Sequence, residues 1–239
     1  MLADARTAIV TGASRGIGRE VALRLAELGY DIALLAKENS EPVAQQIRAM
    51  KRRAFSSCVD VRSSADVNSA IGATVQELGP VDVLINCAGV AFFGGVDHCS
   101  EDEWLQTIDV NLNGYFRMIK AVLPAMKERK QGSIINMSSV WGQQGAQSMV
   151  AYAASKYGIE GLTASFALEA QSAGIKVTSI VLDKVDTDFR DGMTTHVVFS
   201  PEQRCRMLSP GDVADTVAYV LACSARCLPE SITLKAWLF

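Results

Sequence analysis

Two polar residues near the middle of the chain have the types and spacing that acid–base chemistry requires. Tyr152 and Lys156 are four residues apart, so on a helix they share one face and lie about 6 Å apart along its axis. A tyrosine phenol has a pKa of about 10 and is a poor acid or base near neutral pH, but a neighbouring ammonium stabilises the phenolate and lowers that pKa. The pair therefore predicts a tyrosine that exchanges a proton, although this spacing also occurs by chance in many helices.

Two further polar residues stand at positions where a catalytic role is possible. Ser139 lies at the end of a predicted strand, and parallel sheets bind ligands beyond the carboxyl ends of their strands. Asn111 falls inside a predicted long helix, where a buried amide needs hydrogen-bond partners. Each signal is weak alone, and its value depends on whether the fold brings these residues together.

A glycine-rich segment near the amino terminus has the composition of a phosphate-binding turn. It reads Thr11-Gly12-Ala13-Ser14-Arg15-Gly16-Ile17-Gly18 and lies between a predicted first strand and first helix. There, glycine lets the backbone approach a pyrophosphate, and the helix amino terminus supplies amide donors and a favourable dipole. The spacing differs from the GxGxxG fingerprint of dinucleotide-binding proteins, and glycines in such a turn can also be purely structural.

The end of the second predicted strand bears on the choice between NAD and NADP. An NAD site usually carries an acidic residue there for the ribose hydroxyl, whereas this strand ends at Ala36 and is followed by Lys37. Arg15, inside the glycine-rich segment, is a second base, and two cations converging on a 2′-phosphate favour NADP. The alternatives are that both bases are solvated surface residues, or that Glu38 binds the ribose.

These residues fall within a regular alternation of short apolar runs and longer amphipathic ones. The apolar runs predict strands at residues 7–11, 30–36, 54–59, 81–86, 132–138, 176–182 and 231–235. Helices are predicted at residues 20–28, 41–51, 63–78, 100–129, 152–172, 200–207 and 210–224. Strands alternating with helices of this length predict a parallel sheet covered on both faces. We therefore expect a single-domain α/β protein over residues 1–239, with a doubly wound parallel sheet (Rossmann fold) of about seven strands.

Composition excludes several classes of protein. The chain has 239 residues, of which 49% are hydrophobic and 21% charged, as is ordinary for a globular protein. A net charge of −3 gives no field that would attract nucleic acid or an anionic membrane. The amino terminus lacks a signal-peptide core, and the longest uncharged stretch, residues 131–155, is too polar to span a membrane. Six irregularly spaced cysteines and two histidines predict reduced thiols, no metal site and a cytoplasmic location.

Five motifs, in this order, resemble those of the short-chain dehydrogenase/reductase family over nearly the whole chain. They are Thr11-Gly12-xxx-Gly16-x-Gly18, Asp60-Val61, Asn86-Cys87-Ala88-Gly89, Asn111, and Ser139 with Tyr152 and Lys156. Each motif is weak to moderate alone, and together they are highly specific. The resemblance implies an NADP(H)-dependent oxidoreductase that reduces the carbonyl group of a small ketone or diketone to an alcohol.

The resemblance also implies a role for each catalytic residue. Tyr152 would be the general acid that protonates the carbonyl oxygen, and Ser139 would hydrogen-bond that oxygen. Lys156 would bind the nicotinamide ribose and lower the pKa of Tyr152, and Asn111 would hold a water that relays protons to Lys156. The implied NADP site comprises Gly12, Ser14, Arg15, Gly16, Ile17, Gly18, Lys37, Asp60, Val61, Asn86, Ala88, Gly89, Tyr152, Lys156, Val185 and Thr187.

Three departures from the family pattern bear on the substrate and the cofactor. Cys87 stands where an asparagine is usual, and Leu182-Asp183 replaces a Pro-Gly turn beside the nicotinamide. The chain also lacks the Val-Asp-Gly-Gly ending of members resembling 3-oxoacyl carrier-protein reductases, so a 3-oxoacyl thioester reductase ranks second to a general carbonyl reductase. Asp183 would either favour the cationic oxidised nicotinamide or pair with Lys184 or Arg190. Outside enzymes, the alternative is a sensor or scaffold that binds NADP without turnover.

Two apolar segments lead to expectations about partners. The predicted substrate loop covers about residues 188–206. Its apolar side chains, together with the Met207 that follows, favour either an apolar substrate or simple packing on the sheet. These residues are Phe189, Met193, Val197, Val198, Phe199 and Met207. The predicted helix at residues 152–172 has more apolar positions than one core-facing stripe needs, namely Tyr157, Ile159, Leu162, Phe166 and Leu168. Members of the family are commonly dimers or tetramers, so we expect a homodimer or homotetramer.

Overall fold

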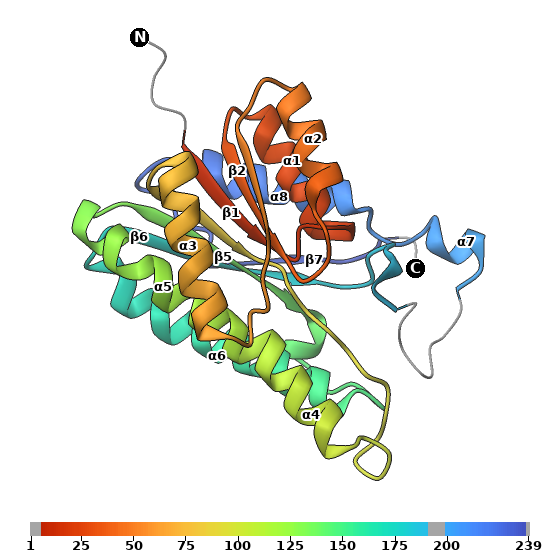
Figure 1. Ribbon diagram of the computed structural model, residues 1–239. Helices are drawn as coiled ribbons and strands as arrows, with labels where there is room; N and C mark the ends of the chain where they lie inside the picture. The colour runs from red at the N-terminus through yellow and green to blue at the C-terminus, as the bar shows by residue number, and fades with distance from the viewer. Residues whose placement is uncertain (1–5, 191–198, 238–239) are drawn as a thin grey trace.

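A seven-stranded parallel sheet forms the centre of the protein in a computed structural model, which describes residues 6–190 and 199–237 (Figure 1). The strands are β1 (Thr7–Thr11), β2 (Asp31–Ala36), β3 (Ala54–Cys58), β4 (Val81–Asn86), β5 (Gly132–Ser139), β6 (Ile175–Leu182) and β7 (Ser231–Leu234). Their order across the sheet is β3-β2-β1-β4-β5-β6-β7, and every neighbouring pair is parallel. The strand order reverses between β1 and β4, and sheets of this kind bind ligands at that switch point.

Helices cover both faces of the sheet and enclose two hydrophobic cores. On one face lie α1 (Gly16–Glu27), α2 (Glu41–Ala49) and α8 (Pro210–Ala222). On the other face lie α3 (Ser64–Leu78), α5 (Gly114–Arg129) and α6 (Val150–Gln171). Strands β1 and β2 are buried along their whole length, as their continuous apolar sequences require. The expected doubly wound α/β fold is therefore confirmed.

Helices α1 and α7 differ clearly in their bounds from those predicted. Helix α1 begins at Gly16 rather than near residue 20, because Gly18 packs against the turn: a Cβ there would lie 2.3 Å from the carbonyl oxygen of Gly12. The helix predicted at residues 200–207 is a single turn, α7 (Pro201–Arg204), because the backbone after it pairs with the segment after β6. Both differences depend on contacts between segments rather than on local sequence.

The long helix predicted at residues 100–129 is two helices joined by a π-helical turn. Helix α4 (Glu101–Ile108) ends at the turn Asp109–Asn113, and α5 continues from there. Single π turns inside helices are frequent at functional sites, and this one carries the buried Asn111.

The predicted substrate loop is described only in part. Met193, Val197 and Val198 of that loop lie outside the described residues, whereas Phe189, Phe199 and Met207 lie within them. Within residues 6–190 and 199–237, no helix is both long enough and apolar enough to cross a bilayer.

Candidate active site

A cleft lies at the carboxyl edge of the sheet, where the loops after six neighbouring strands, β1 to β6, meet. It brings together most of the residues that the sequence predicted for a site, namely Gly12, Ser14, Arg15, Gly16, Ile17, Gly18, Lys37, Asp60, Val61, Ala88, Gly89, Ser139, Tyr152, Lys156, Val185 and Thr187. Asn86 and Asn111 are fully buried and lie behind its wall. Asn86 donates to the side-chain oxygen of Asn136 at 2.9 Å, which links β4 to β5.

Lys156 is the one lysine that the structure buries among the residues described. Only 4% of it is exposed, and its Nζ donates to the carbonyl oxygen of Met137 at 2.8 Å. The ammonium lies 5.4 Å from the ring centroid of Tyr152 and 5.6 Å from that of Tyr115. Burial lowers the pKa of Lys156 to about 8, with Cys87 and Glu160 acting in the opposite direction.

The same burial shifts the pKa of the Cys87 thiol in the direction opposite to that of Lys156. Burial raises its pKa to about 12, against a lowering effect of Lys156. The thiol therefore stays protonated near neutral pH and adds no charge beside the Lys156 ammonium.

Asn111 finds its hydrogen-bond partners on two neighbouring segments. Its Nδ2 donates to the carbonyl oxygen of Val90 at 2.9 Å and to Oγ of Ser155 at 3.0 Å. Its Oδ1 accepts from the amide of Val90 at 2.8 Å. The π turn thus ties the loop after β4 to α6, the helix that carries Tyr152 and Lys156.

Ser139 and Tyr152 lie in the same cleft among aromatic side chains. Ser139 ends β5, is 7% exposed, and its Oγ accepts from the amide of Trp141 at 3.2 Å. The Trp141 ring meets the Tyr152 ring edge-on, with centroids 6.0 Å apart, and the Phe189 ring lies 6.2 Å away from Tyr152. The reactive hydroxyl groups therefore sit beside a largely apolar wall.

The glycine turn after β1 requires glycine at the positions the sequence singled out. Gly12 has φ of +67°, and a Cβ there would lie 2.8 Å from Cα of Ala88 in the loop after β4. Gly16 also has a left-handed φ, +54°. A side chain at Gly12 would separate the loops after β1 and β4, which both line the cleft.

The same turn fits the pyrophosphate of a dinucleotide. Helix α1 has no side-chain cap at its amino terminus, where Arg15 is the capping residue, whereas serine hydroxyls cap α3 and α4. Its first residues, Gly16 and Ile17, line the cleft. Uncapped amide donors at a helix amino terminus suit a phosphate group.

The charged residues near the expected 2′-phosphate position form a more mixed cluster than the two converging cations that the sequence predicted. Arg15 lies 3.6 Å from Glu38, and both side chains are more than half exposed. Lys37 lines the same end of the cleft. Asp60 pairs with Arg62 at 2.6 Å, and this hydrogen-bonded partner, opposed by partial burial, lowers the pKa of Asp60 to about 2.

The segment after β6 brings Thr187 to the glycine turn. A Cβ on Gly16 would lie 3.5 Å from Cγ2 of Thr187. Asp183, which replaces the family glycine, donates its backbone amide to Leu234 at 3.0 Å, and its carboxylate is 3.7 Å from Nζ of Lys184. The predicted pairing with Lys184 is therefore present, at the upper limit of an ion pair.

Sequence reasoning did not identify Tyr115, Trp141 or Glu160 as part of this environment. Tyr115 stands four residues after Asn111, and Glu160 four residues after Lys156, so helical spacing from a known site residue was the available signal. Trp141 follows Ser139 by two positions and had no signal of its own.

A glycine turn between β1 and α1, together with a serine, a tyrosine and a buried lysine at the same sheet edge, defines a dinucleotide-binding α/β oxidoreductase. The chain belongs to the short-chain dehydrogenase family, because the family model described as short chain dehydrogenase matches residues 6–197.

Individual relatives agree with this assignment over nearly their full length. The chain is 36% identical over 227 residues to a 3-oxoacyl-[acyl-carrier-protein] reductase FabG of Staphylococcus aureus, with 92% of each chain covered. It is 34% identical to a putative ketoacyl reductase of Streptomyces coelicolor, covering 91% of this chain and 90% of the relative. Among solved structures, the F189W actinorhodin polyketide ketoreductase with NADPH matches with a TM-score of 0.89 and 31% identity, covering 98% and 97% of the two chains.

Proposed function

We propose that this protein is an NADPH-dependent reductase that converts the carbonyl group of a small molecule into an alcohol. The observation that carries this proposal is that the glycine turn and the Tyr152–Lys156 pair share one cleft at the switch point of the sheet. A protein that only binds a nucleotide need not keep the whole set of Asn111, Ser139, Tyr152 and Lys156 that proton transfer to a carbonyl group uses. This argues against the sensor or scaffold alternative.

Tyr152 is suited to donate the proton that the carbonyl oxygen takes up. Ser139 donates a hydrogen bond to the same oxygen, and a positioned proton donor typically accelerates a reaction by about 10²–10⁴-fold. The Lys156 ammonium, 5.4 Å from the Tyr152 ring centroid, stabilises the negative charge that remains on the phenol oxygen. Asn111 holds the loop after β4 against α6 and would carry the water that passes protons to Lys156.

NADPH, when bound, supplies the hydride for the reduction. The relatives support this choice of cofactor, since three structural neighbours are complexes with NADPH, NADP or a hydroxylated NADP. The residues that would hold it are Gly12, Ser14, Arg15, Gly16, Ile17, Gly18, Lys37, Asp60, Val61, Asn86, Ala88, Gly89, Tyr152, Lys156, Val185 and Thr187. Arg15 and Lys37 would bind the 2′-phosphate, after Arg15 exchanges Glu38 for the phosphate.

The substrate in this proposal is a small apolar ketone or diketone. Beside Tyr152, an apolar cluster of Ala91 and Met149 packs with Phe93 and Trp141. A wall of this kind offers dispersion contacts and few polar partners, which favours a substrate without charge near its carbonyl group.

A 3-oxoacyl thioester is the second candidate for the substrate. The observation that favours it is the identity of 36% to a 3-oxoacyl-[acyl-carrier-protein] reductase over 92% of both chains. Both candidates place the same carbonyl chemistry at Tyr152, so they differ only in the group that the apolar wall contacts.

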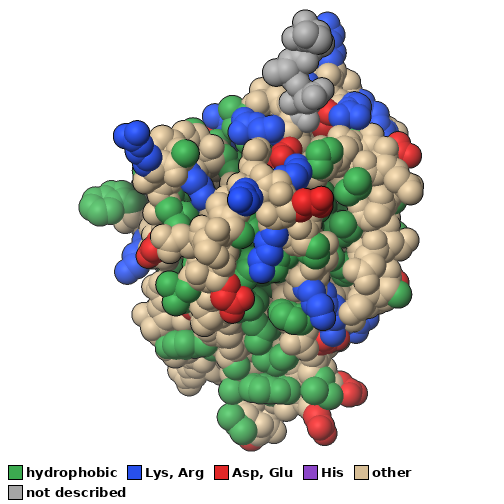
Figure 2. Space-filling model, turned by 90° about the vertical axis from the view of Figure 1, so that its left-hand side faces the viewer, with side chains coloured by type: hydrophobic (Ala, Val, Ile, Leu, Met, Phe, Trp, Pro, Cys, Tyr) green, Lys and Arg blue, Asp and Glu red, His purple; other side chains and the backbone are tan. Residues whose placement is uncertain are grey.

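Self-association of this chain is suggested by its exposed apolar residues. On α6, Tyr157 is 48% exposed and Leu168 is 77% exposed, while on α5 Phe116 is 51% exposed. Figure 2 shows hydrophobic side chains gathered at its lower end, the end where Figure 1 places α4 and α6. We propose that the protein forms a homodimer or homotetramer through these helices. We also propose that residues 1–239 form a single domain and that the protein is located in the cytoplasm.

The experiment that tests the proposed function measures NADPH oxidation against a panel of ketones, diketones and 3-oxoacyl thioesters. We expect turnover of at least one class, with the alcohol identified as product. NADPH binding without oxidation against any carbonyl substrate in the panel would contradict the proposal and favour the sensor or scaffold alternative.

A further inference from the structure

Tyr115, on α5, is buried directly against the catalytic lysine. Only 1% of the residue is exposed, and its hydroxyl donates to the carbonyl oxygen of Met137 at 3.2 Å. The same carbonyl oxygen accepts from Nζ of Lys156 at 2.8 Å. One backbone oxygen of β5 therefore joins Tyr115 to Lys156.

The Tyr115 ring also faces the charge of Lys156. Nζ lies over this ring at 5.6 Å from its centroid and over the Tyr152 ring at 5.4 Å, so the ammonium has an aromatic ring on two sides. Ring faces carry negative electrostatic potential and attract cations within about 6 Å, most strongly where water is excluded. Burial of Lys156 meets that condition.

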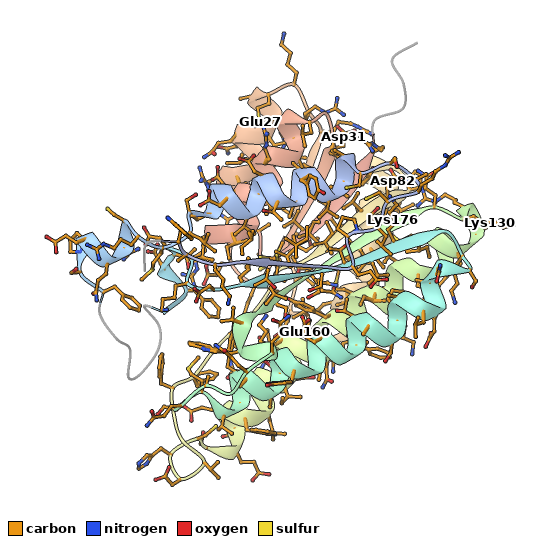
Figure 3. All side chains as sticks on the ribbon, turned by 180° about the vertical axis from the view of Figure 1, so that it is seen from behind. Glu27, Asp31, Asp82, Lys130, Glu160 and Lys176 are labelled. Atoms are coloured by element: carbon orange, nitrogen blue, oxygen red, sulfur yellow. The ribbon has the colours of Figure 1, made fainter. Side chains whose placement is uncertain are left out.

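Two other titratable groups act on this ammonium, one directly after β4 and one on α6 itself. Cys87, at the end of β4, is a neutral thiol near neutral pH because burial raises its pKa to about 12. Glu160 extends from α6 toward the sheet, where its Oε1 accepts from the hydroxyl of Ser179 on β6 at 2.5 Å (Figure 3). The ammonium therefore has two aromatic rings, the Met137 carbonyl and the neutral Cys87 thiol around it, with one carboxylate one helical turn further along α6.

We propose that Tyr115 is a positioning residue for catalysis, whose ring holds the Lys156 ammonium charged beside Tyr152. This inference rests on the proposed function only for the role of Lys156, because the contacts between Tyr115 and Lys156 exist whatever the substrate is. Tyr115 acts on the reaction only through Lys156.

The ring opposes the effect of burial on the lysine. Without it, the ammonium loses one of its two aromatic neighbours while it stays buried, so its pKa falls further below the ordinary value. At 5.6 Å the ring is close to the outer limit of such contacts, and we expect a fall of about one pH unit, equivalent to ~1.4 kcal/mol. At pH 8 or above, such a fall leaves most of the lysine uncharged.

Three variants distinguish the effect of the Tyr115 ring from the effect of its hydroxyl and from the effect of lost side-chain volume in the core. Tyr115→Leu removes the ring, and Tyr115→Phe keeps the ring but removes the hydroxyl. Tyr30→Leu is the matched control, because Tyr30 is 2% exposed and makes its aromatic contact with Arg6 instead. Thermal unfolding of all three identifies effects that come from a cavity in the core.

Two titrations read out the result for each variant. The first follows the side-chain nitrogen of isotope-labelled lysine by NMR in the protein without cofactor, with the Lys156 signal assigned by its absence in Lys156→Met. The second follows kcat for ketone reduction against pH. In Tyr115→Leu we expect the titration midpoint of Lys156 to fall by about one pH unit. The alkaline limb of the kcat–pH profile should shift to lower pH by the same amount. In Tyr115→Phe and Tyr30→Leu we expect both to stay near their wild-type positions.

The outcomes distinguish this inference from the proposed function. An unchanged or raised Lys156 midpoint in Tyr115→Leu overturns the positioning role. A lowered midpoint with an unchanged kcat profile supports the contact but contradicts the role of Lys156 in catalysis, which belongs to the proposed function. If Tyr115→Leu does not fold, a Lys156 midpoint in Tyr115→Phe that falls by the full pH unit overturns the role of the ring, and an unchanged midpoint supports it.

Discussion

Replacing the buried Lys156 by methionine should make the protein more stable near neutral pH. Burial lowers the pKa of Lys156 from 10.5 to about 8, so the folded protein binds this proton less tightly than the unfolded chain does. Below pH 8, the free energy of unfolding of the wild-type protein is lowered by the full cost of burying the charged Lys156. This destabilisation disappears as the pH rises toward 10.5. The two pKa values correspond to roughly 3 kcal/mol of destabilisation at pH 7 and less than about 1 kcal/mol at pH 10.

Methionine is a suitable replacement because it fills similar space without a charge. The Met137 carbonyl oxygen keeps its bond from the Tyr115 hydroxyl, so the substitution of Lys156 leaves no buried acceptor without a donor. Urea unfolding at successive pH values measures the free energy of unfolding of wild type and Lys156→Met. The exposed Lys127→Met variant controls for the change of side-chain type.

The expected result for Lys156→Met is a gain in stability that is largest at neutral pH and shrinks as the pH is raised. A variant that is less stable than wild type at pH 7, or a difference in stability that does not change with pH, would show that the buried charge of Lys156 does not destabilise the protein. Ketone reduction should be lost in this variant although its stability rises, as expected where an active site retains an unfavourable buried charge.

Three further predictions concern the cofactor and assembly. Wild type should use NADPH in preference to NADH. Lys37→Ala should reduce this preference severalfold in kcat/KM, because it removes a charge-assisted contact with the 2′-phosphate. Equal kcat/KM for both cofactors in wild type would contradict the predicted 2′-phosphate site. Because Asp183 pairs with Lys184, Asp183→Asn should leave the ratio of NADPH to NADP⁺ affinity nearly unchanged in direct titrations; a tightening of NADPH relative to NADP⁺ would show that the carboxylate acts on the nicotinamide. Light scattering at micromolar concentration should give the mass of a dimer or tetramer, and Leu168→Asp, at a residue that is 77% exposed, should lower it; a monomeric wild type would exclude the assembly.

The features that the sequence predicts well are those that depend on local patterns. β1 and β2 are continuous apolar runs that read as buried strands, and parallel strands that alternate with helices place all their carboxyl ends at one edge. That geometry is enough to bring Gly12, Ser139 and Tyr152 into one cleft, although they are far apart in the chain. The cleft was therefore predictable from the order of the motifs.

The features that the sequence does not predict depend on contacts between distant segments. The apolar pattern of residues 100–129 runs without interruption through the π turn Asp109–Asn113, so nothing local marks it. Tyr115 reads as an ordinary core position until α5 packs beside the helix that carries Lys156. Likewise, the pairing of Arg15 with Glu38 depends on how the glycine turn lies beside the end of β2.

The central claim, that Tyr152 donates the proton in carbonyl reduction, is tested most directly by Tyr152→Phe. The measurement is kcat for the best substrate, together with the Kd of NADPH from a binding titration of the same preparations. We expect kcat to fall by about 10²–10⁴-fold, with the Kd for NADPH nearly unchanged. Turnover close to that of wild type would remove Tyr152 from the mechanism.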